Sequence, residues 1–381
     1  MIAKAEIGKV QFEKKPHFLL LDALRGVAAL LVLWYHIYEC FPLEHQWFNH
    51  GYLAVDFFFI LSGFVIGYAY DDRWKKGLTA GRFIKRRLVR LHPMVIAGVL
   101  IGTVTFLIQG GVQWDGSKVP LSMLMIAVLL NLFLIPNIPG ALFEVRGNGE
   151  MFPLNGPSWS LFFEYIANIF YFLVLRRFTT VVLAIFTALA GAGYIWYAIA
   201  DVAEYGSMGV GWTLADGNLI GGLLRVGFAF PMGMLLSRVF KPHKIKRAFL
   251  WCTFILVGFM AVPFISVNDS TLWNRLFDAF CVICIFPLVV LLGASGTAGG
   301  KRSETMCTFL GNISYPLYIV HYPFMYLFYA YIGFPDTFRT PAETWPLHIL
   351  LFFGSIFIAW IFWKFYDRPL RNRLSSKFTK L

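Results

Sequence analysis

The chain has 381 residues, of which 58% are hydrophobic and only 14% are charged, against roughly 25% charged residues in an ordinary soluble domain. This composition excludes a soluble globular protein, and the 40 phenylalanines exclude intrinsic disorder, which requires low hydrophobicity. It predicts a single polytopic membrane body. The net charge of +12 would suggest nucleic acid in a soluble domain, but here the basic residues lie between apolar runs, so we expect no nucleic-acid partner.

The N-terminal 17 residues contain Lys4, Lys9, Lys14 and Lys15 and lead directly into an apolar run without a small-residue cleavage site. We therefore expect residues 1–17 to be a cytosolic segment rather than a cleaved signal peptide.

The cysteines are odd in number and lie mostly inside apolar runs, which argues against a disulfide framework. Cys281 and Cys284 form a CxxC pair, but the pair has no second CxxC and no nearby histidine. We expect no metal site there.

Apolar runs long enough to be considered as membrane spans occur eleven times. They are 18–39, 51–70, 88–109, 120–135, 158–175, 179–199, 219–237, 249–266, 272–293, 306–331 and 346–366. The run 120–135 is the shortest and is followed by PNIPG.

The distribution of Lys and Arg favours ten spans rather than eleven. If 120–135 does not cross, nearly all basic loops lie on the cytosolic side, and only Lys118, Arg146 and Arg339 lie outside. We therefore predict an all-α membrane protein with about ten transmembrane helices and both termini in the cytosol. Residues 120–135 would form a re-entrant or interfacial helix. The membrane domain would cover 18–366 and a basic cytosolic tail 367–381.

Ionisable side chains inside apolar spans are costly, so each is a candidate functional residue that faces the bundle interior. These are Asp22, Arg25, His36, Asp56, Arg90, Glu164, Arg225, Arg275, Asp278 and His321.

The first span places Arg25 and His36 on one face, because 11 residues correspond to three helical turns plus about 20°. The rise between them is about 16 Å, so Arg25 lies toward the cytosol and His36 toward the outer half. Asp22 lies one turn before Arg25 and can form an ion pair with it, which is a structural explanation for both. His36 could transfer protons in a reaction, because an imidazole can gain or lose a proton near neutral pH. The alternative is that His36 is a buried histidine with a structural role only.

The sequence KRRLVRLHP at 85–93 places Arg86, Arg87 and Arg90 at the cytosolic start of the third span. These arginines can anchor the span by the positive-inside rule. They also suit a phosphate-rich ligand, because guanidinium groups bind phosphate through paired donors.

Six blocks, in order, resemble the membrane acyltransferase-3 family. They are LDALRGVAALLVLWYH at 21–36, GYLAVDFFFILSGF at 51–64, RRLVRLHP at 86–93, PSWSLFFEY at 157–165, LGNISYPLYIVHYP at 310–323 and YDRPLRNRL at 366–374. The resemblance implies about ten helices and transfer of an acyl group, mostly acetyl, from cytosolic acyl-CoA to a sugar hydroxyl of an exported or surface glycan. Acyl-CoA would be the donor substrate, with no permanently bound cofactor and no metal, in a bacterial cytoplasmic membrane.

On this reading His36 is a general base or forms an acyl-histidine, and Arg25, held by Asp22, stabilises negative charge. Arg86, Arg87 and Arg90 bind the CoA phosphates. Glu164 either binds the acceptor or orients His36, unless it only caps its helix.

Further candidates are expected to bind the acceptor or to support the site. Ser62 is better explained by close helix packing beside Gly63 and Gly67. Trp114, Trp159 and Trp212 could stack on sugar rings or belong to an interfacial belt. The remaining candidates are Asp56, Arg225, Asn312, Tyr315 and His321. Arg225, and Arg275 with Asp278, are expected either to form buried pairs or to line an acceptor path.

The rival function is a transporter or flippase, because buried charges also mark substrate paths in such proteins. No inverted repeat is visible in the sequence, which favours the enzyme.

Overall fold

The computed structural model describes residues 17–138, 144–265, 270–336 and 338–378. Residues 1–16 of the predicted N-terminal segment and 379–381 of the predicted tail lie outside the described residues.

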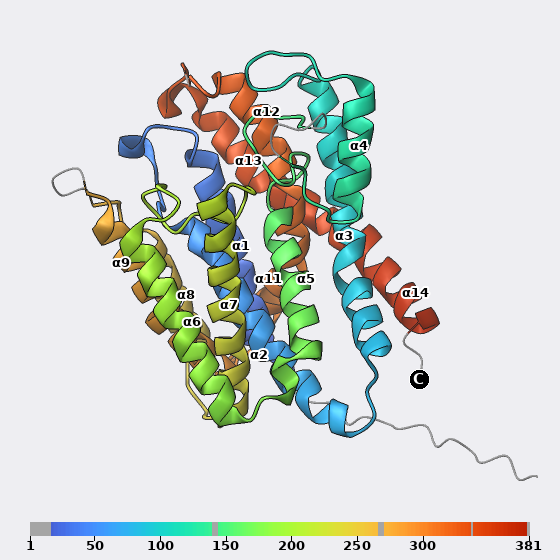
Figure 1. The fold of residues 1–381 in the computed structure, drawn as a ribbon, viewed down its shortest axis with the longest axis vertical. Helices are drawn as coiled ribbons and strands as arrows, with labels where there is room; N and C mark the ends of the chain where they lie inside the picture. Colours follow the sequence, from blue (N-terminus) through green and yellow to red (C-terminus); the bar gives the residue numbers. More distant parts are fainter. Residues whose placement is uncertain (1–16, 139–143, 266–269, 337, 379–381) are drawn as a thin grey trace, which may run out of the picture.

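The described chain folds into helices that run roughly parallel to the long axis of the molecule (Figure 1). Their bounds are α1 Leu19–Tyr38, α2 Ala54–Lys75, α3 Ala80–Ile108, α4 Leu121–Leu132, α5 Ser158–Leu173, α6 Thr180–Ala200, α7 Asp216–Val239, α8 Ala248–Met260, α9 Leu272–Phe280, α10 Phe286–Ala294, α11 Lys301–Val320, α12 Tyr322–Ile332, α13 Pro341–Ile361 and α14 Arg368–Phe378. Two π-helical segments, Cys281–Ile285 and Phe362–Asp367, join α9 to α10 and α13 to α14 without a loop.

Three helices begin at threonine caps, which satisfy backbone N–H groups that have no partner within the helix. Thr79 accepts from the backbone N–H of Arg82 before α3, and Thr179 accepts from that of Val182 before α6. Thr340 and Glu343 form a reciprocal capping box before α13.

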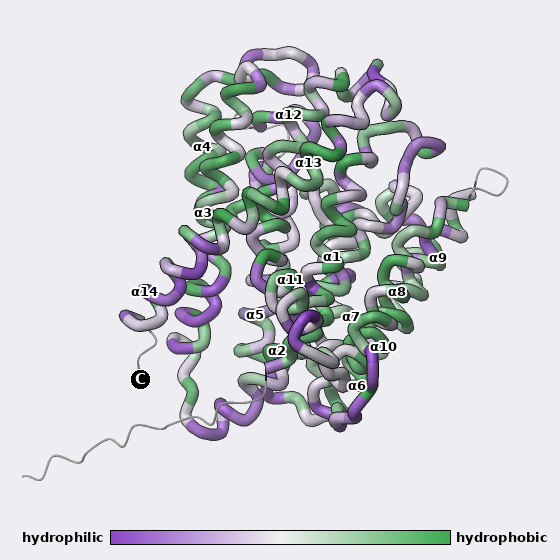
Figure 2. Tube along the Cα trace, turned by 180° about the vertical axis from the view of Figure 1, so that it is seen from behind, coloured by the Kyte–Doolittle hydropathy of each residue, from purple (hydrophilic) through white to green (hydrophobic). Residues whose placement is uncertain are grey.

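The all-α membrane architecture predicted from composition is confirmed. Within the described residues, eight helical stretches are long and apolar enough to cross a membrane, while α4 and α8 are apolar but shorter. The predicted count of ten and the cytosolic placement of both termini stay predictions. In Figure 2, which colours the chain by hydropathy, the helices of the bundle are largely hydrophobic (green), whereas α14 and the loops at the lower end of the view contain many hydrophilic residues (purple).

Helix α4 occupies the predicted re-entrant region and has only 12 residues, a length of about 18 Å. A hydrocarbon core of about 30 Å cannot be crossed by such a helix. It lies beside the upper part of α3 in both views, and Leu124 and Ala127 pack with Val99 and Phe106. The chain on both sides of α4 therefore stays at one end of the molecule, as the sequence predicts.

The predicted span 306–331 is wrong as a single helix, because α11 ends at Val320 and α12 begins at Tyr322. Pro323 has no N–H to donate to the carbonyl of Ile319. The side-chain amide of Asn155 donates to that carbonyl instead, at 3.1 Å. The break places His321 between the two helices.

Small residues bring helix pairs into close contact. A Cβ at Gly63 of α2 would lie 2.0 Å from the carbonyl oxygen of Phe230, and one at Gly67 would lie 2.4 Å from Oγ of Ser237, both on α7. A Cβ at Gly26 of α1 would lie 2.5 Å from the carbonyl oxygen of Leu310 on α11. The packing predicted for Gly63 and Gly67 is confirmed, and α1, the helix of Arg25 and His36, is held against α11.

Candidate active site

Two cavities lie along α1. We call the first, of about 100 Å³, the arginine cavity, because Asp22, Arg25, Arg87 and Arg90 line it. We call the second, of about 250 Å³, the histidine cavity, because His36 lines it. The helical spacing predicted from sequence thus separates Arg25 and His36 into different cavities.

In the histidine cavity, His36 is held by a carboxylate that the sequence analysis missed. Its Nδ1 lies 2.7 Å from Oε1 of Glu39, and the hydroxyl of Tyr329 donates to the same oxygen at 2.8 Å. A carboxylate oxygen accepts the hydrogen bond in such a contact, so Nδ1 is the donor and Nε2 is the ring nitrogen that Glu39 does not engage. The sequence signal was the i, i+3 spacing of His36 and Glu39, at the very end of the span.

His321 lies against His36, with the ring centroids 5.4 Å apart and the rings nearly parallel. Its Nδ1 donates to the carbonyl of Leu317 at 2.9 Å, and the side chain is fully buried. Its Nε2 has no hydrogen-bond partner among the described residues. The break between α11 and α12 therefore places the imidazole of His321 next to that of His36.

Aromatic side chains from several loops and helices surround the histidine cavity. Trp114, Trp159 and Trp212, which the sequence analysis considered for sugar stacking, all line it. Two phenylalanines, Phe152 and Phe334, line it as well, together with seven tyrosines: Tyr35, Tyr52, Tyr205, Tyr318, Tyr322, Tyr326 and Tyr329.

A second carboxylate, Glu150, lines the histidine cavity. Tyr326 donates its hydroxyl to Glu150, and the side-chain amide of Asn148 donates to it at 2.7 Å. Glu150 belongs to the long loop before α5, and no helical periodicity marked it in the sequence.

In the arginine cavity, Arg25 and Asp22 form the predicted ion pair at 3.2 Å. Arg25 also donates to Oγ of Ser314 on α11 at 2.9 Å. Tyr315, another predicted residue, lines this cavity and donates its hydroxyl to the carbonyl of Leu91 at 2.6 Å. Asn312 lies on the same helix, is half-buried, and lines neither cavity.

Glu164 lies in the arginine cavity and does not orient His36. Its Oε1 accepts from Nη2 of Arg87 at 2.5 Å and from Oγ of Ser62 at 2.8 Å. Arg87 is therefore buried and forms an ion pair with Glu164. Arg90 also lines the cavity but is not part of this ion pair. Arg86 lies outside the cavity, in an adjoining groove. Ser62 therefore has a polar contact with Glu164 in addition to its place in α2, which packs tightly against α7 at Gly63.

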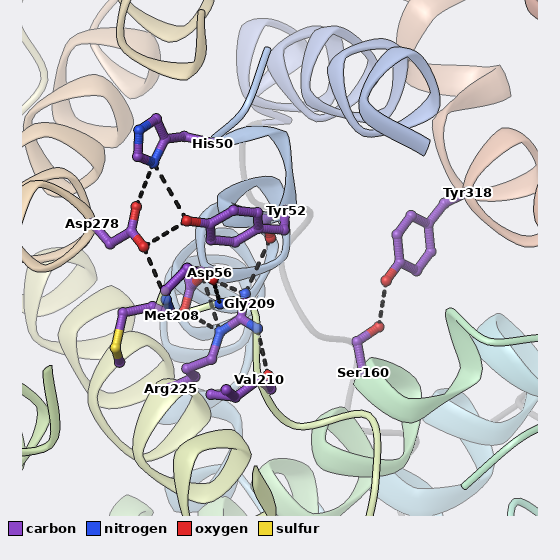
Figure 3. A network of polar contacts seen from close by, with 11 residues as sticks. His50, Tyr52, Asp56, Ser160, Met208, Gly209, Val210, Arg225, Asp278 and Tyr318 are labelled. Atoms are coloured by element: carbon purple, nitrogen blue, oxygen red, sulfur yellow. Dashed lines mark hydrogen bonds and ion pairs between the residues drawn. The ribbon is translucent and has the colours of Figure 1, made fainter. Parts of the chain in front are cut away.

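A buried polar network lies behind the histidine cavity (Figure 3). Arg225 of α7 donates to both carboxylate oxygens of Asp56 and to the backbone carbonyls of Tyr52 and Val210. Its guanidinium also lies 5.0 Å from the ring centroid of Trp159. The network thus fixes a wall of the cavity.

Asp278 belongs to the same network, but its partners do not include Arg275, which the sequence analysis considered. It accepts from Tyr52 at 2.6 Å and lies 2.6 Å from Nδ1 of His50. Arg275, in contrast, lies 3.7 Å from Asp201 and donates to the carbonyl of Ala198. The suggested pairing of Arg275 with Asp278 is therefore wrong, because the two side chains leave α9 toward different neighbours.

Only a thin layer of side chains separates the two cavities. Val55 and Tyr318 line both of them. The hydroxyl of Tyr318 is hydrogen-bonded to Oγ of Ser160 at 2.8 Å (Figure 3). We call these three side chains the partition.

The chain matches one protein-family model, described as an acyltransferase domain, over residues 18–364. The chain belongs to this acyltransferase family. The blocks that carried the resemblance meet at the two cavities: 21–36 and 310–323 contribute to both, and 86–93 contributes to the arginine cavity.

Among relatives of this acyltransferase, a Rhizobium radiobacter protein named protein 2 in picA locus is 34% identical over 164 residues, 40% of this chain and 80% of that protein. A Staphylococcus aureus protein with the provisional name O-acetyltransferase is 24% identical over 393 residues, 96% of this chain. That match spans only 59% of the S. aureus protein. A Komagataeibacter xylinus protein with the provisional name membrane-bound transacylase is 26% identical over 80% of this chain and 72% of its own. No solved structure matches the chain.

Proposed function

We propose that this protein transfers an acyl group, in the first place acetyl, from cytosolic acyl-CoA to a hydroxyl of a sugar in an exported or surface glycan. The observation that carries the proposal is the His36–Glu39 pair at 2.7 Å in a cavity that adjoins an arginine-lined cavity. Family membership and the relatives named as O-acetyltransferase and transacylase support it. We place the protein in a bacterial cytoplasmic membrane.

His36 acts as the general base in this mechanism. The acceptor hydroxyl oxygen attacks the thioester carbonyl carbon while its proton passes to Nε2 of His36. The C–S bond then breaks and the CoA thiolate takes up that proton, so the products are an O-acyl ester and free CoA. Glu39 holds the imidazole and stabilises the imidazolium that forms between these steps.

A covalent variant uses the same residues in two steps. Nε2 of His36 attacks the thioester carbonyl carbon, the C–S bond breaks and CoA leaves as the thiolate. The acceptor hydroxyl oxygen then attacks the acyl carbon, the bond from that carbon to Nε2 breaks, and the hydroxyl proton passes to the released Nε2 and from there to the CoA thiolate. Retention of labelled acyl group on His36 in the absence of acceptor distinguishes this variant from direct transfer.

Arg25 belongs to the donor side rather than to the reacting carbonyl, because it lies about 16 Å along α1 from His36. In the arginine cavity Arg25 is paired with Asp22 and Arg87 with Glu164, which makes the cavity a polar path for the arm of CoA. Arg90 lines the cavity outside these two pairs and would bind the phosphates of CoA. The reactive thioester would cross the partition to reach Nε2 of His36.

The acceptor would occupy the histidine cavity. Its tryptophans and tyrosines provide faces on which sugar rings stack, and Glu39 and Glu150 accept hydrogen bonds from hydroxyl groups. Arg225 is already paired with Asp56. The cavity therefore suits a neutral sugar better than an anionic one.

The proposal is tested by comparing surface glycans from cells with and without the protein by mass spectrometry. We expect an O-acyl ester to disappear and to return with the wild-type gene, but not with His36→Ala. Buried charged side chains inside a helix bundle also mark the substrate paths of transporters. If the purified protein releases no CoA thiol in the presence of acyl-CoA and acceptor, while cells lacking it fail to export the glycan, the transporter function is correct instead.

A further inference from the structure

A basic groove adjoins the arginine cavity on the outside of the bundle. Helices α2, α3 and α14 form it, and its volume is about 510 Å³. We call it the α14 groove; its lining residues are Tyr70, Arg86, Val89, Arg90, Arg368, Arg371, Asn372 and Ser375. Four of them are arginines, from two helices that are far apart in the sequence.

Most of these guanidinium groups form no ion pair with a carboxylate among the described residues. Arg371 forms an ion pair with buried Asp367 at 2.7 Å. Arg86, Arg90 and Arg368 form no ion pair with a carboxylate in the part of the chain that the structure describes. Like charges gathered at one groove repel one another, so an anion that binds there is stabilised by all of them.

The α14 groove adjoins the arginine cavity, because Arg90 and Arg371 line both spaces. A ligand with one end in the groove and the other in the cavity would pass between these two side chains. Typical small-molecule sites have volumes of roughly 300–1,000 Å³. The groove alone is in that range and suits a nucleotide, whereas the narrower cavity suits a thin flexible arm.

We propose that Arg368 and Arg371 of α14, with Arg86 and Arg90 of α3, bind the phosphates at the nucleotide end of acyl-CoA. The C-terminal helix α14 is then part of the donor site, and the pantetheine arm passes through the arginine cavity. This inference rests on the proposed function, because it takes acyl-CoA as the donor.

Anionic lipid headgroups present the same phosphate chemistry, and basic residues near a membrane surface attract them. Only the coenzyme, however, has an arm that would extend into the arginine cavity. The two sources of phosphate are therefore distinguished by whether binding depends on that arm and on the 3′-phosphate.

The test uses the full-length protein in nanodiscs of neutral lipid and isothermal titration calorimetry with CoA, dephospho-CoA and pantetheine. The main variant is Arg86→Ala with Arg368→Ala, which leaves the Arg371–Asp367 pair intact. Lys85→Ala with Arg373→Ala is the matched control, because it removes the same charge from exposed positions of the same two helices outside the groove. Thermal unfolding of each variant confirms that it is folded.

We expect the main variant to bind CoA on the order of 10- to 100-fold more weakly than wild type, because charge-assisted hydrogen bonds are lost. It should discriminate less between CoA and dephospho-CoA, and its affinity for pantetheine should be unchanged. The control variant should bind CoA as wild type does. These results together support the inference.

Wild-type affinity for CoA in the folded main variant overturns the inference while leaving the proposed function intact. Failure of the wild-type protein to bind CoA at all contradicts the proposed function itself. Repeating the titration with anionic lipid gives a third outcome: if that lipid displaces CoA from wild type and main variant equally, the groove is not the nucleotide site.

Discussion

Glu39, the residue that follows α1, binds Nδ1 of His36 at 2.7 Å, and Tyr329 of α12 donates to the same carboxylate oxygen. The imidazole is therefore held by its own helix end and by α12. This arrangement orients His36 and leaves Nε2 as the ring nitrogen that Glu39 does not engage.

Replacement of His36 by Ala should lower turnover by about 10² to 10⁴-fold, which is the usual contribution of a positioned base. Binding of acyl-CoA and the melting temperature should be retained, because the arginines that we propose to bind the donor lie outside the histidine cavity. His45→Ala, at an exposed histidine, is the control. If a folded His36→Ala protein has near wild-type turnover, His36 is not the general base, and His321 is the next candidate.

Glu39→Gln should reduce turnover at least tenfold while donor affinity changes little. The amide keeps the size of the side chain but cannot stabilise an imidazolium as a carboxylate does. Glu44→Gln is a suitable control, because Glu44 is exposed and lies in the loop that follows α1. Rates of CoA thiol release at saturating donor provide the measurement, and equal rates in both variants would remove Glu39 from the mechanism.

The Asp56–Arg225 pair should contribute to stability as a unit. Arg225→Ala leaves a fully buried carboxylate without its partner, and breaking such a pair typically costs about 3–5 kcal/mol. Thermal unfolding in detergent should show a large loss for each single alanine variant. The double variant should lose clearly less than the sum, and strict additivity would mean that the two side chains are energetically independent.

Val55→Trp should block transfer without preventing donor binding, because Val55 lines both cavities and a larger ring fills the passage between them. Val55→Ala should remain active and serves as the control. The measurement is CoA affinity beside thiol release on the same preparation. Normal transfer by folded Val55→Trp would show that the thioester does not pass the partition.

The predicted sides of the membrane can be tested at two glycines with similar conformations. Gly77 and Gly116 have φ of 87° and 86°, and a Cβ at either has no neighbour within 4 Å. In intact cells, an impermeant thiol reagent should label Gly116→Cys and not Gly77→Cys. The reverse result would invert the topology.

Local patterns predicted most of the helices. The apolar runs and their charged flanks located them, and the short run before PNIPG is indeed a helix too short to cross. The ion pair of Asp22 with Arg25 also followed from spacing, because both residues lie on one helix.

The contacts between helices could not be predicted in the same way. Glu164 and Ser62 lie 102 positions apart, and their hydrogen bond depends on how α2 and α5 are rotated and tilted. Those angles follow from packing at glycines such as Gly63, which a hydropathy pattern does not reveal. For the same reason, hydropathy could not show that Glu164 does not orient His36, or that Arg275 and Asp278 do not pair with each other, although each was one of the alternatives that the sequence left open.

The hydrogen bond from Asn155 to Ile319 joins positions that are 164 residues apart. At a synthesis rate of about 5–20 residues per second, Ile319 is made on the order of 10–30 s after Asn155. Until then the side chain of Asn155 lacks the carbonyl of Ile319, and His321 is not yet present beside His36. Helices α11 and α12, which are synthesised late, therefore complete a site to which α1, the first helix, already contributes His36.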